Sequence, residues 1–380
     1  MSRKSVFERH PKKTLIVIVV VLFLLVDFGT AAVLKMLDLF TPAYQTTYER
    51  ESKYRQSHPV YHHTLKPNAY ADNAEWGGDE YEVYTNSLGF KDSVNRTIEL
   101  KPKSKRLVLI GDSFTEGVGI EYQQTFAGLI DTYFRDKDIE VLNAGVLSYS
   151  PIIYYKKIQY LLETVGLEFD HLVVFVDISD IANEANLYDF DENNNVKTRE
   201  DGLTFVWVRP KESKPIRNFF NNHSFFIARI RTLLRIYRGK RHSWDDSLNF
   251  EEALWTMDDK AYSNYGELGV QLAQQRMDLL KKLLDEHQIK LTLVVYPWPD
   301  QIFRRDLNSR QVTVWQDWCR TNEVPFINLF PDFINESDPE TTIRSLFITG
   351  DVHWNAAGHQ RIADGFLQRF MQTYEQAPVN

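Results

Sequence analysis

The stretch Arg106–Gly117, RLVLIGDSFTEG, decides the fold class. Its first part, Leu107–Ile110, is a short uninterrupted apolar run, which is typical of a strand buried on both faces of a parallel sheet. Gly111 permits a tight turn, and Ser113 stands directly after the strand. In an open α/β sheet, ligands bind at the carboxyl ends of the strands. A serine at this place is therefore positioned as a nucleophile would be.

The alternation of strand and helix patterns continues to the end of the chain. Further apolar runs that read as strands lie at residues 139–142, 172–176, 291–296 and 325–328. Helical patterns fall between and after them at 125–134, 152–165, 270–287, 312–321 and 357–374. Strands that alternate with helices predict an α/β sandwich around a parallel sheet. We expect this domain to span residues 106–374.

An insertion at residues 184–262 interrupts the alternation. It holds the polar stretch 189–201 and then the segment 219–241, in which aromatic and aliphatic residues mix with arginines. This segment packs on the domain with solvated arginines, forms a lid, or lies on an anionic membrane surface. We favour packing on the domain.

The N-terminus is basic and then apolar. Residues 1–13 carry five basic side chains and one acidic side chain, whereas the whole chain has a net charge of −8. The next 21 residues, Thr14–Leu34, contain one charged residue, Asp27, and have the length that a membrane-spanning helix needs. The basic flank predicts a cytoplasmic tip at 1–13, an anchor at 14–34 and a periplasmic or otherwise extracytoplasmic body. The alternative is a cleaved signal peptide.

Asp27 is tolerated in such a span if its carboxylate reaches the interface or meets a partner helix. After the anchor, residues 36–105 are expected to form a connector or N-terminal extension, and its His62 and His63 are expected at the surface or at an interface. The single cysteine, Cys319, excludes an intrachain disulfide and a cysteine-cluster metal site. The acidic net charge gives no support for a nucleic-acid partner.

Candidate catalytic residues complete the case for Ser113. A serine hydroxyl needs an adjacent base, and that base needs an orienting group. Asp351 and His353 lie two residues apart just before the last helix, so both can project from one loop toward Ser113. His359 falls on the helix that follows and is expected to pack or to cap. Gly145 follows the second strand, so its N–H and that of Ser113 are candidate oxyanion donors at one sheet edge.

These blocks resemble the SGNH/GDSL hydrolase superfamily over residues 106–370. Gly111-Asp112-Ser113 is similar to its first block, Gly145 falls where the second block has its glycine donor, and Asp351 with His353 resembles the last block. The resemblance implies a three-layer α/β/α sandwich with a flavodoxin-like parallel sheet and a Ser-His-Asp triad. Residues 61–90 are more loosely similar to segments ahead of this domain in bacterial membrane-anchored relatives.

Two blocks depart from the family pattern. The third block is Gly-x-Asn-Asp, whose asparagine donates to the oxyanion, but residues 177–180 read DISD. The donor would then be the Ser179 hydroxyl or the Asn183 amide. The last block is usually Asp-x-x-His, whereas this chain has Asp351-x-His353 followed by tryptophan. The alginate O-acetyltransferase branch shares that shorter spacing, so the departure favours acyl transfer beside plain hydrolysis.

The sequence therefore predicts a membrane-anchored serine esterase that acts on ester groups, most readily O-acetyl groups, of an envelope glycan or lipid. One alternative is an O-acyltransferase with the same triad. Another is a non-catalytic envelope protein that keeps the fold to bind a glycan or an assembly partner. A lipase or phospholipase is a further possibility raised by the aromatic insertion. Asp351, His353 and His359 lack a metal-binding motif, and no metal or cofactor is predicted.

Overall fold

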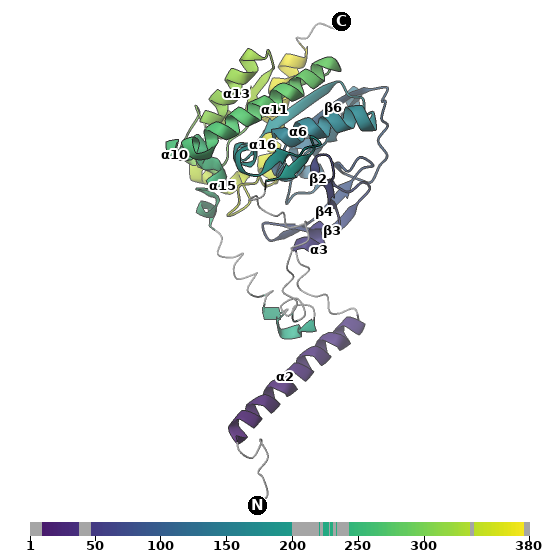
Figure 1. The fold of residues 1–380 in the computed structure, drawn as a ribbon, viewed down its shortest axis with the longest axis vertical. Coiled ribbons are helices and arrows are strands. Elements are labelled where there is room, and N and C mark those ends of the chain that lie inside the picture. Colours follow the sequence, from purple (N-terminus) through teal and green to yellow (C-terminus); the bar gives the residue numbers. More distant parts are fainter. Residues whose placement is uncertain are drawn as a thin grey trace, which may run out of the picture. The chain divides into compact units, whose positions relative to one another are not determined.

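The computed structural model describes residues 10–37, 47–199, 220, 223–227, 229–230, 233, 243–334 and 338–375. The chain divides into two compact units. The first contains residues 1–49 and 209–241, and the second contains residues 50–208 and 242–380. In the first unit, α2 (Pro11–Met36) is one continuous helix (Figure 1). Most of its apolar side chains are exposed.

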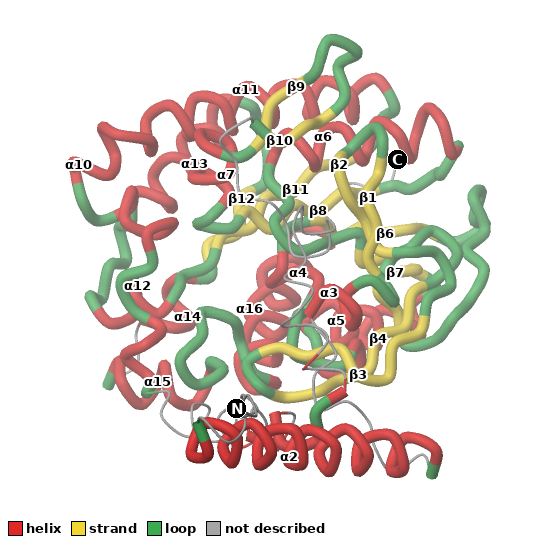
Figure 2. Tube along the Cα trace, turned by 60° about the horizontal axis from the view of Figure 1, so that its bottom comes forward, coloured by secondary structure: helices red, strands yellow, loops and turns green. Residues whose placement is uncertain are grey.

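The second unit is built on an eight-stranded sheet in the order β12-β11-β8-β6-β7-β5-β4-β3. The five strands from β12 to β7 pair in parallel, as the apolar runs predict. Their bounds are β6 (Lys105–Ile110), β7 (Ile139–Asn143), β8 (His171–Val176), β11 (Lys290–Val295) and β12 (Phe326–Asn328). Most residues of these strands are buried, because helices cover both faces of the sheet (Figure 2).

The helices form the two outer layers of the sandwich. On one face, the Phe175 ring of β8 packs against Phe126 and Phe366, with ring centroids 4.5 and 5.6 Å apart. These rings belong to α5 (Phe126–Phe134) and α16 (Ala356–Glu375). The other face carries α6 (Pro151–Gln159), which runs into a π-helix, together with α7 (Asp180–Asn186), α11 (Glu267–Glu286) and α13 (Arg310–Thr321). The predicted α/β/α architecture is confirmed.

The region expected as a connector contributes strands to the main sheet. Strands β3 (Tyr70–Trp76), β4 (Asp79–Thr85) and β5 (Lys91–Asp92) continue the sheet beyond β7, and they pair antiparallel. The sheet is therefore mixed rather than purely parallel. Ahead of these strands, α3 (Thr47–Glu51) precedes the hairpin of β1 (Arg55–His58) and β2 (His62–Leu65).

The expectation that both histidines of this hairpin lie at the surface or an interface is wrong for His63. Its side chain is buried, and its Nε2 lies 2.7 Å from the carbonyl oxygen of Leu147. Burial lowers the pKa of His63 well below its ordinary value. The hairpin is thus part of the core of the second unit.

The smaller elements complete the second unit. The insertion starts with the antiparallel pair β9 (Tyr188–Phe190) and β10 (Val196–Thr198). Short helices follow the strands near their carboxyl ends: α4 (Ser113–Glu116), α12 (Pro299–Phe303), α14 (Phe330–Ile334) and α15 (Pro339–Leu346), with α10 (Asp259–Ala261) ahead of α11. Most of the insertion segment 219–241 lies outside the described residues.

Candidate active site

Ser113 is the first residue of α4, directly beyond the carboxyl end of β6. The preceding residue, Asp112, caps this helix, because its Oδ1 accepts a hydrogen bond of 3.0 Å from the N–H of Phe114. The turn is tight: a Cβ at Gly111 would stand 2.1 Å from Thr115 Oγ1 and 2.8 Å from the carbonyl oxygen of Phe175. The strand, the glycine and the cap together fix the serine at the sheet edge.

Ser113, His353 and Asp351 form one hydrogen-bonded chain. The Oγ of Ser113 lies 2.7 Å from Nε2 of His353. The other ring nitrogen, Nδ1, lies 2.5 Å from Oδ1 of Asp351. The same carboxylate oxygen accepts from the backbone N–H of His353 at 2.9 Å, which holds the two side chains in one loop. This order of groups is that of a serine nucleophile, its base and an orienting carboxylate.

Trp76, at the end of β3, contacts both partners of the serine. Its Nε1 donates to Oδ2 of Asp351 at 3.1 Å, and its ring stands edge-on to the His353 ring at 4.9 Å. Burial raises the pKa of Asp351, but the charge of His353 and hydrogen bonds from His353 and Trp76 outweigh burial and bring the pKa below its ordinary value. The carboxylate therefore stays ionised at neutral pH.

Gly145 lies against the nucleophile helix. A Cβ at this position would stand 2.6 Å from Thr115 Cγ2 and 3.0 Å from the backbone nitrogen of Glu116. Its N–H donates to the Asn143 side chain at 3.1 Å, and that side chain in turn donates to the carbonyl oxygen of Thr115. The loop after β7 is thus packed against the helix that begins with Ser113.

The third strand end places Ser179 beside Asp177. The Ser179 hydroxyl donates to Oδ1 of Asp177 at 2.6 Å, and the Ser179 N–H donates to the same oxygen at 2.8 Å. The role of Ser179 as an oxyanion donor, for which its hydroxyl has to leave Asp177, stays a prediction. Asn183 is half-buried on α7, and among the described residues its side chain has no hydrogen bond to Ser113.

The first three blocks of the resemblance to the SGNH/GDSL hydrolases follow neighbouring parallel strands of one α/β/α sandwich. This is the architecture that the resemblance implies. No family model and no curated protein matches the sequence. The chain is similar in structure to a lipolytic G-D-S-L family member from Veillonella parvula, at 11% identity and a TM-score of 0.39 over 71% of this chain and 100% of that chain.

It is also similar to the psychrotrophic esterase EstA from Pseudoalteromonas sp., at 10% identity and a TM-score of 0.39 over 72% of this chain and 100% of that chain. An acetylxylan esterase from Geobacillus stearothermophilus, solved as a catalytic mutant, matches at 12% identity and a TM-score of 0.38, covering 71% of this chain and 96% of that chain. At such identities, the case for the site rests on the geometry of Ser113, His353 and Asp351.

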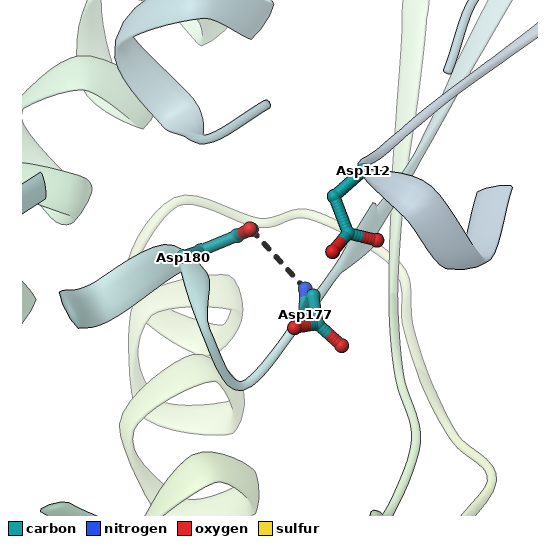
Figure 3. Close-up of side chains that lie close together, drawn as sticks. All are labelled: Asp112, Asp177 and Asp180. Atoms are coloured by element: carbon teal, nitrogen blue, oxygen red, sulfur yellow. Dashed lines mark hydrogen bonds between the residues drawn. The ribbon is translucent and has the colours of Figure 1, made fainter. Parts of the chain in front are cut away.

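Close to the nucleophile, the fold buries three acidic side chains, Asp112, Asp177 and Asp180 (Figure 3). One carboxyl oxygen from each lies within 4.8 Å of the other two. Asp177 accepts from Trp298 Nε1 at 2.7 Å, and Asp180 accepts from the Tyr154 hydroxyl at 2.8 Å. Neutral donors therefore bind two of the three carboxyl groups.

The surroundings raise the pKa of all three carboxyl groups. Burial and the neighbouring Asp177 carboxylate raise the pKa of Asp112 well above its ordinary value. Burial and Asp112 do the same to the pKa of Asp180. Burial also raises the pKa of Asp177 against the opposing effect of its hydrogen bonds. Because three close carboxylates cannot all ionise in a dry site, we expect the cluster to hold protons at neutral pH.

His359 takes the packing and capping role that the sequence predicts. It is buried on α16, and its Nδ1 accepts from the N–H of Phe126, the first residue of α5. Its ring packs against Trp354 with a centroid distance of 5.5 Å. The histidine is thus held by α5 and the core.

Sequence reasoning missed a set of residues that brace this site from the N-terminal extension. Glu116, in the nucleophile helix, is fully buried and binds the guanidinium of Arg55 through Nη1 and Nη2 at 2.6 and 2.5 Å. The same carboxylate accepts from the N–H of Leu147, in the loop after Gly145. The extension, the nucleophile helix and the Gly145 loop therefore meet at one buried ion pair.

Proposed function

We propose that this chain is a serine esterase whose nucleophile is Ser113. The hydrogen-bonded chain Ser113–His353–Asp351 at the carboxyl end of β6 carries the proposal. A second support is the ionised state of Asp351, which stabilises the imidazolium that forms when the histidine takes a proton. The hydrolase class rests on this local geometry and on the blocks that resemble the SGNH family.

The reaction follows from these contacts. Ser113 Oγ attacks the acyl carbonyl carbon while its proton passes to Nε2 of His353, 2.7 Å away. The N–H groups of Ser113 and Gly145 are proposed to stabilise the oxyanion, for which the Gly145 N–H has to leave the Asn143 side chain. The bond to the alcohol breaks, and His353 returns the proton to that alcohol. A water molecule, deprotonated by His353, then cleaves the acyl-serine and restores the free hydroxyl.

The exposure of the site favours a small acyl group. Ser113 is 5% exposed and His353 is 7% exposed. The Phe114 ring stacks on His353 at 4.6 Å, and Trp76 closes a second side. Because aromatic rings flank the buried nucleophile and base, we propose a small acyl group, and hence an O-acetyl ester, as the substrate. The alcohol that bears it is proposed to belong to an envelope glycan or lipid.

Membrane attachment through α2 is proposed as well. An 18-residue window of this helix has a mean hydropathy of 2.8, although a signal sequence would pass the same test. Its apolar residues are largely exposed in the folded chain, for example Leu15 at 62% and Val26 at 63%. An anchor of this kind keeps the catalytic unit beside the envelope. Carbonate-resistant membrane association of a full-length chain that retains Met1 tests this point.

Hydrolysis of p-nitrophenyl acetate by the purified full chain tests the esterase. We expect Ser113→Ala and His353→Ala to lower kcat by at least about 10³-fold, since removal of any triad member leaves only residual catalysis. Ser345→Ala, in α15, and the exposed His287→Ala are matched controls that should keep the rate. If Ser113→Ala hydrolyses the ester as fast as the parent chain, the proposal is wrong.

An acetyltransferase is the second candidate. The spacing Asp351-x-His353 favours it, and the same acyl-serine would serve, with a sugar hydroxyl taking the place of water. Incubation with an acetyl ester and a soluble oligosaccharide separates the two reactions: free acetate marks the esterase, and acetylated sugar marks the transferase. A chain that is inert in both assays would support a non-catalytic role in binding a glycan or an assembly partner.

A further inference from the structure

Asp27 is the one acidic residue in α2, and it is the most deeply buried residue of that helix. It is 1% exposed, while the adjacent Val26 is 63% exposed. Its Oδ2 accepts from the Ser224 hydroxyl at 2.5 Å, and its Oδ1 accepts from the N–H of Phe226 at 2.9 Å. The Ser224 oxygen also accepts from the N–H of Ile227. We call these contacts the Asp27 clip.

The clip fastens part of the insertion to α2 within the first unit. We call the described residues 220, 223–227, 229–230 and 233 the returning segment; all but Ser224 are helical. Phe226 packs on Phe23 with ring centroids 5.2 Å apart, and Phe220 packs on Phe28 at 5.8 Å. The segment therefore lies along the half of α2 that is farther from the N-terminus.

The returning segment presents an apolar face to its surroundings. Phe226 is 43% exposed, Ile230 is 53% exposed and Leu233 is 66% exposed. Their spacing of four and three residues places them on one side of a helix. This stripe is continuous with the exposed apolar surface of α2 through the contact of Phe226 with Phe23. If α2 lies in lipid, acyl chains also cover the stripe formed by Phe226, Ile230 and Leu233.

The clip also offsets the free-energy cost of placing an aspartate in a membrane span. A carboxylate in hydrocarbon is expensive unless donors satisfy it. Here a hydroxyl and a backbone N–H supply those bonds. The N–H of Phe226 belongs to the first helical turn after Ser224, where a backbone N–H needs an acceptor outside the helix. Each partner thus removes an unsatisfied polar group from the other.

We propose that the returning segment is a second membrane element, seated in the leaflet distal to the N-terminus with Phe226, Ile230 and Leu233 among the acyl chains. The proposal rests on the anchoring role given to α2 above. It replaces the expected packing of this part of the insertion on the catalytic domain. The chain crosses between the two units after Glu49, Val208 and Arg241, so the catalytic unit is joined to the membrane at three points of its sequence.

Site-directed spin labelling of the full chain in phosphatidylcholine vesicles tests this. In a Cys319→Ala background, single cysteines replace Val20, Ile230, Leu233 and the surface residue Tyr133 of α5. Relaxation by dissolved oxygen compared with a water-soluble nickel chelate reports depth. We expect labels at 20, 230 and 233 to be relaxed mainly by oxygen, and the label at 133 mainly by nickel.

The clip is tested in the same samples. Asp27→Leu should leave the label at 20 in the oxygen-accessible phase and make those at 230 and 233 several-fold more accessible to nickel. Ser224→Ala should give a smaller change in the same direction, and Val26→Leu is the control on α2. Unchanged labels at 230 and 233 in Asp27→Leu would overturn the clip.

Different results would contradict the proposed anchor and the proposed second membrane element. If the label at 20 is embedded while those at 230 and 233 meet nickel in the parent background, the second membrane element is wrong and the anchor stands. If the label at 20 also meets nickel, the anchor itself is wrong. Neither outcome depends on ester hydrolysis.

Discussion

Trp76 links the N-terminal extension to the reacting groups at the scale of single residues. Its N–H reaches Asp351, and its ring limits the movement of His353. It does not contact Ser113 through any described hydrogen bond, so we regard it as a positioning residue. It holds the carboxylate so that the base keeps the tautomer that the reaction needs.

Trp76→Phe should keep the ring and remove the donor. Because a hydrogen bond to a charged group contributes about 1.5–3 kcal/mol, we expect kcat for p-nitrophenyl acetate to fall about tenfold or more, with KM little changed. Trp244→Phe is the control. Full kcat in Trp76→Phe would exclude the positioning role.

Arg55 and Glu116 form the buried pair that joins the extension to the nucleophile helix. Both side chains are at most 1% exposed, and Arg55 also binds Glu51. Arg55→Met leaves the Glu116 carboxylate buried without its cation. We therefore expect the free energy of unfolding, measured in urea, to fall by about 3–5 kcal/mol. The exposed pair of Lys101 and Glu168 provides the control, since Lys101→Met should barely move the midpoint. Equal losses of stability in Arg55→Met and Lys101→Met would contradict the bracing role of Arg55.

At the scale of elements, the loop after β7 and the start of α7 carry two candidate donors to the oxyanion, Gly145 and Ser179. Gly145→Ala puts a methyl group 2.6 Å from Thr115 Cγ2, which forces the loop and its N–H to shift. We expect kcat to fall about 10²-fold, the usual cost of losing one oxyanion donor. Ser179→Ala should change kcat by less than about threefold, because its hydroxyl serves Asp177. A larger fall in kcat for Ser179→Ala than for Gly145→Ala would instead favour Ser179 as the donor.

The parallel strands and their helices could be predicted from the sequence because their signal is local. Leu107–Ile110 is an unbroken apolar run, and the two-residue spacing of Asp351 and His353 marks one loop. The strands β3 and β4 were missed because their inward residues, such as Ala71 and Val83, are separated by exposed polar ones. That alternating pattern is typical of an antiparallel strand that is solvated on one face.

The bracing contacts left no sequence signal. Arg55 and Glu116 stand 61 residues apart, and Trp76 and Asp351 stand 275 residues apart. No local pattern pairs them, because the sheet order rather than the sequence spacing brings them together. The contact of Ser179 with Asp177 could not be predicted either, because Asp177 occupies the place where the family has a glycine.

For the whole molecule, buried histidines make stability depend on pH. Burial lowers the pKa of His171 and of His359 to about 3. In the unfolded chain such groups protonate near pH 6.5, so the unfolded state binds more protons between about pH 6.5 and 3. The stability is therefore fully present above pH 6.5 and is lost as the pH falls through this window, by about 1.4 kcal/mol per pH unit and histidine.

His359→Gln should reduce this loss. The amide oxygen can still accept from the N–H of Phe126, and the titrating ring is gone. We expect the urea midpoints at pH 7 and pH 5 to lie closer together than in the parent chain. The exposed His287→Gln should leave the difference between the two midpoints unchanged. A pH dependence that His359→Gln does not alter would show that other groups govern acid unfolding.

The extension, the sheet and the C-terminal loop converge on one serine, and the proposed function depends on its reactivity. The most direct measurement is labelling of the full chain with a fluorophosphonate, followed by mass spectrometry of the modified peptide. We predict one adduct, on Ser113, that is lost in Ser113→Ala and in His353→Ala and retained in His359→Gln. An unlabelled parent chain, or labelling of Ser113 that persists without His353, would contradict it.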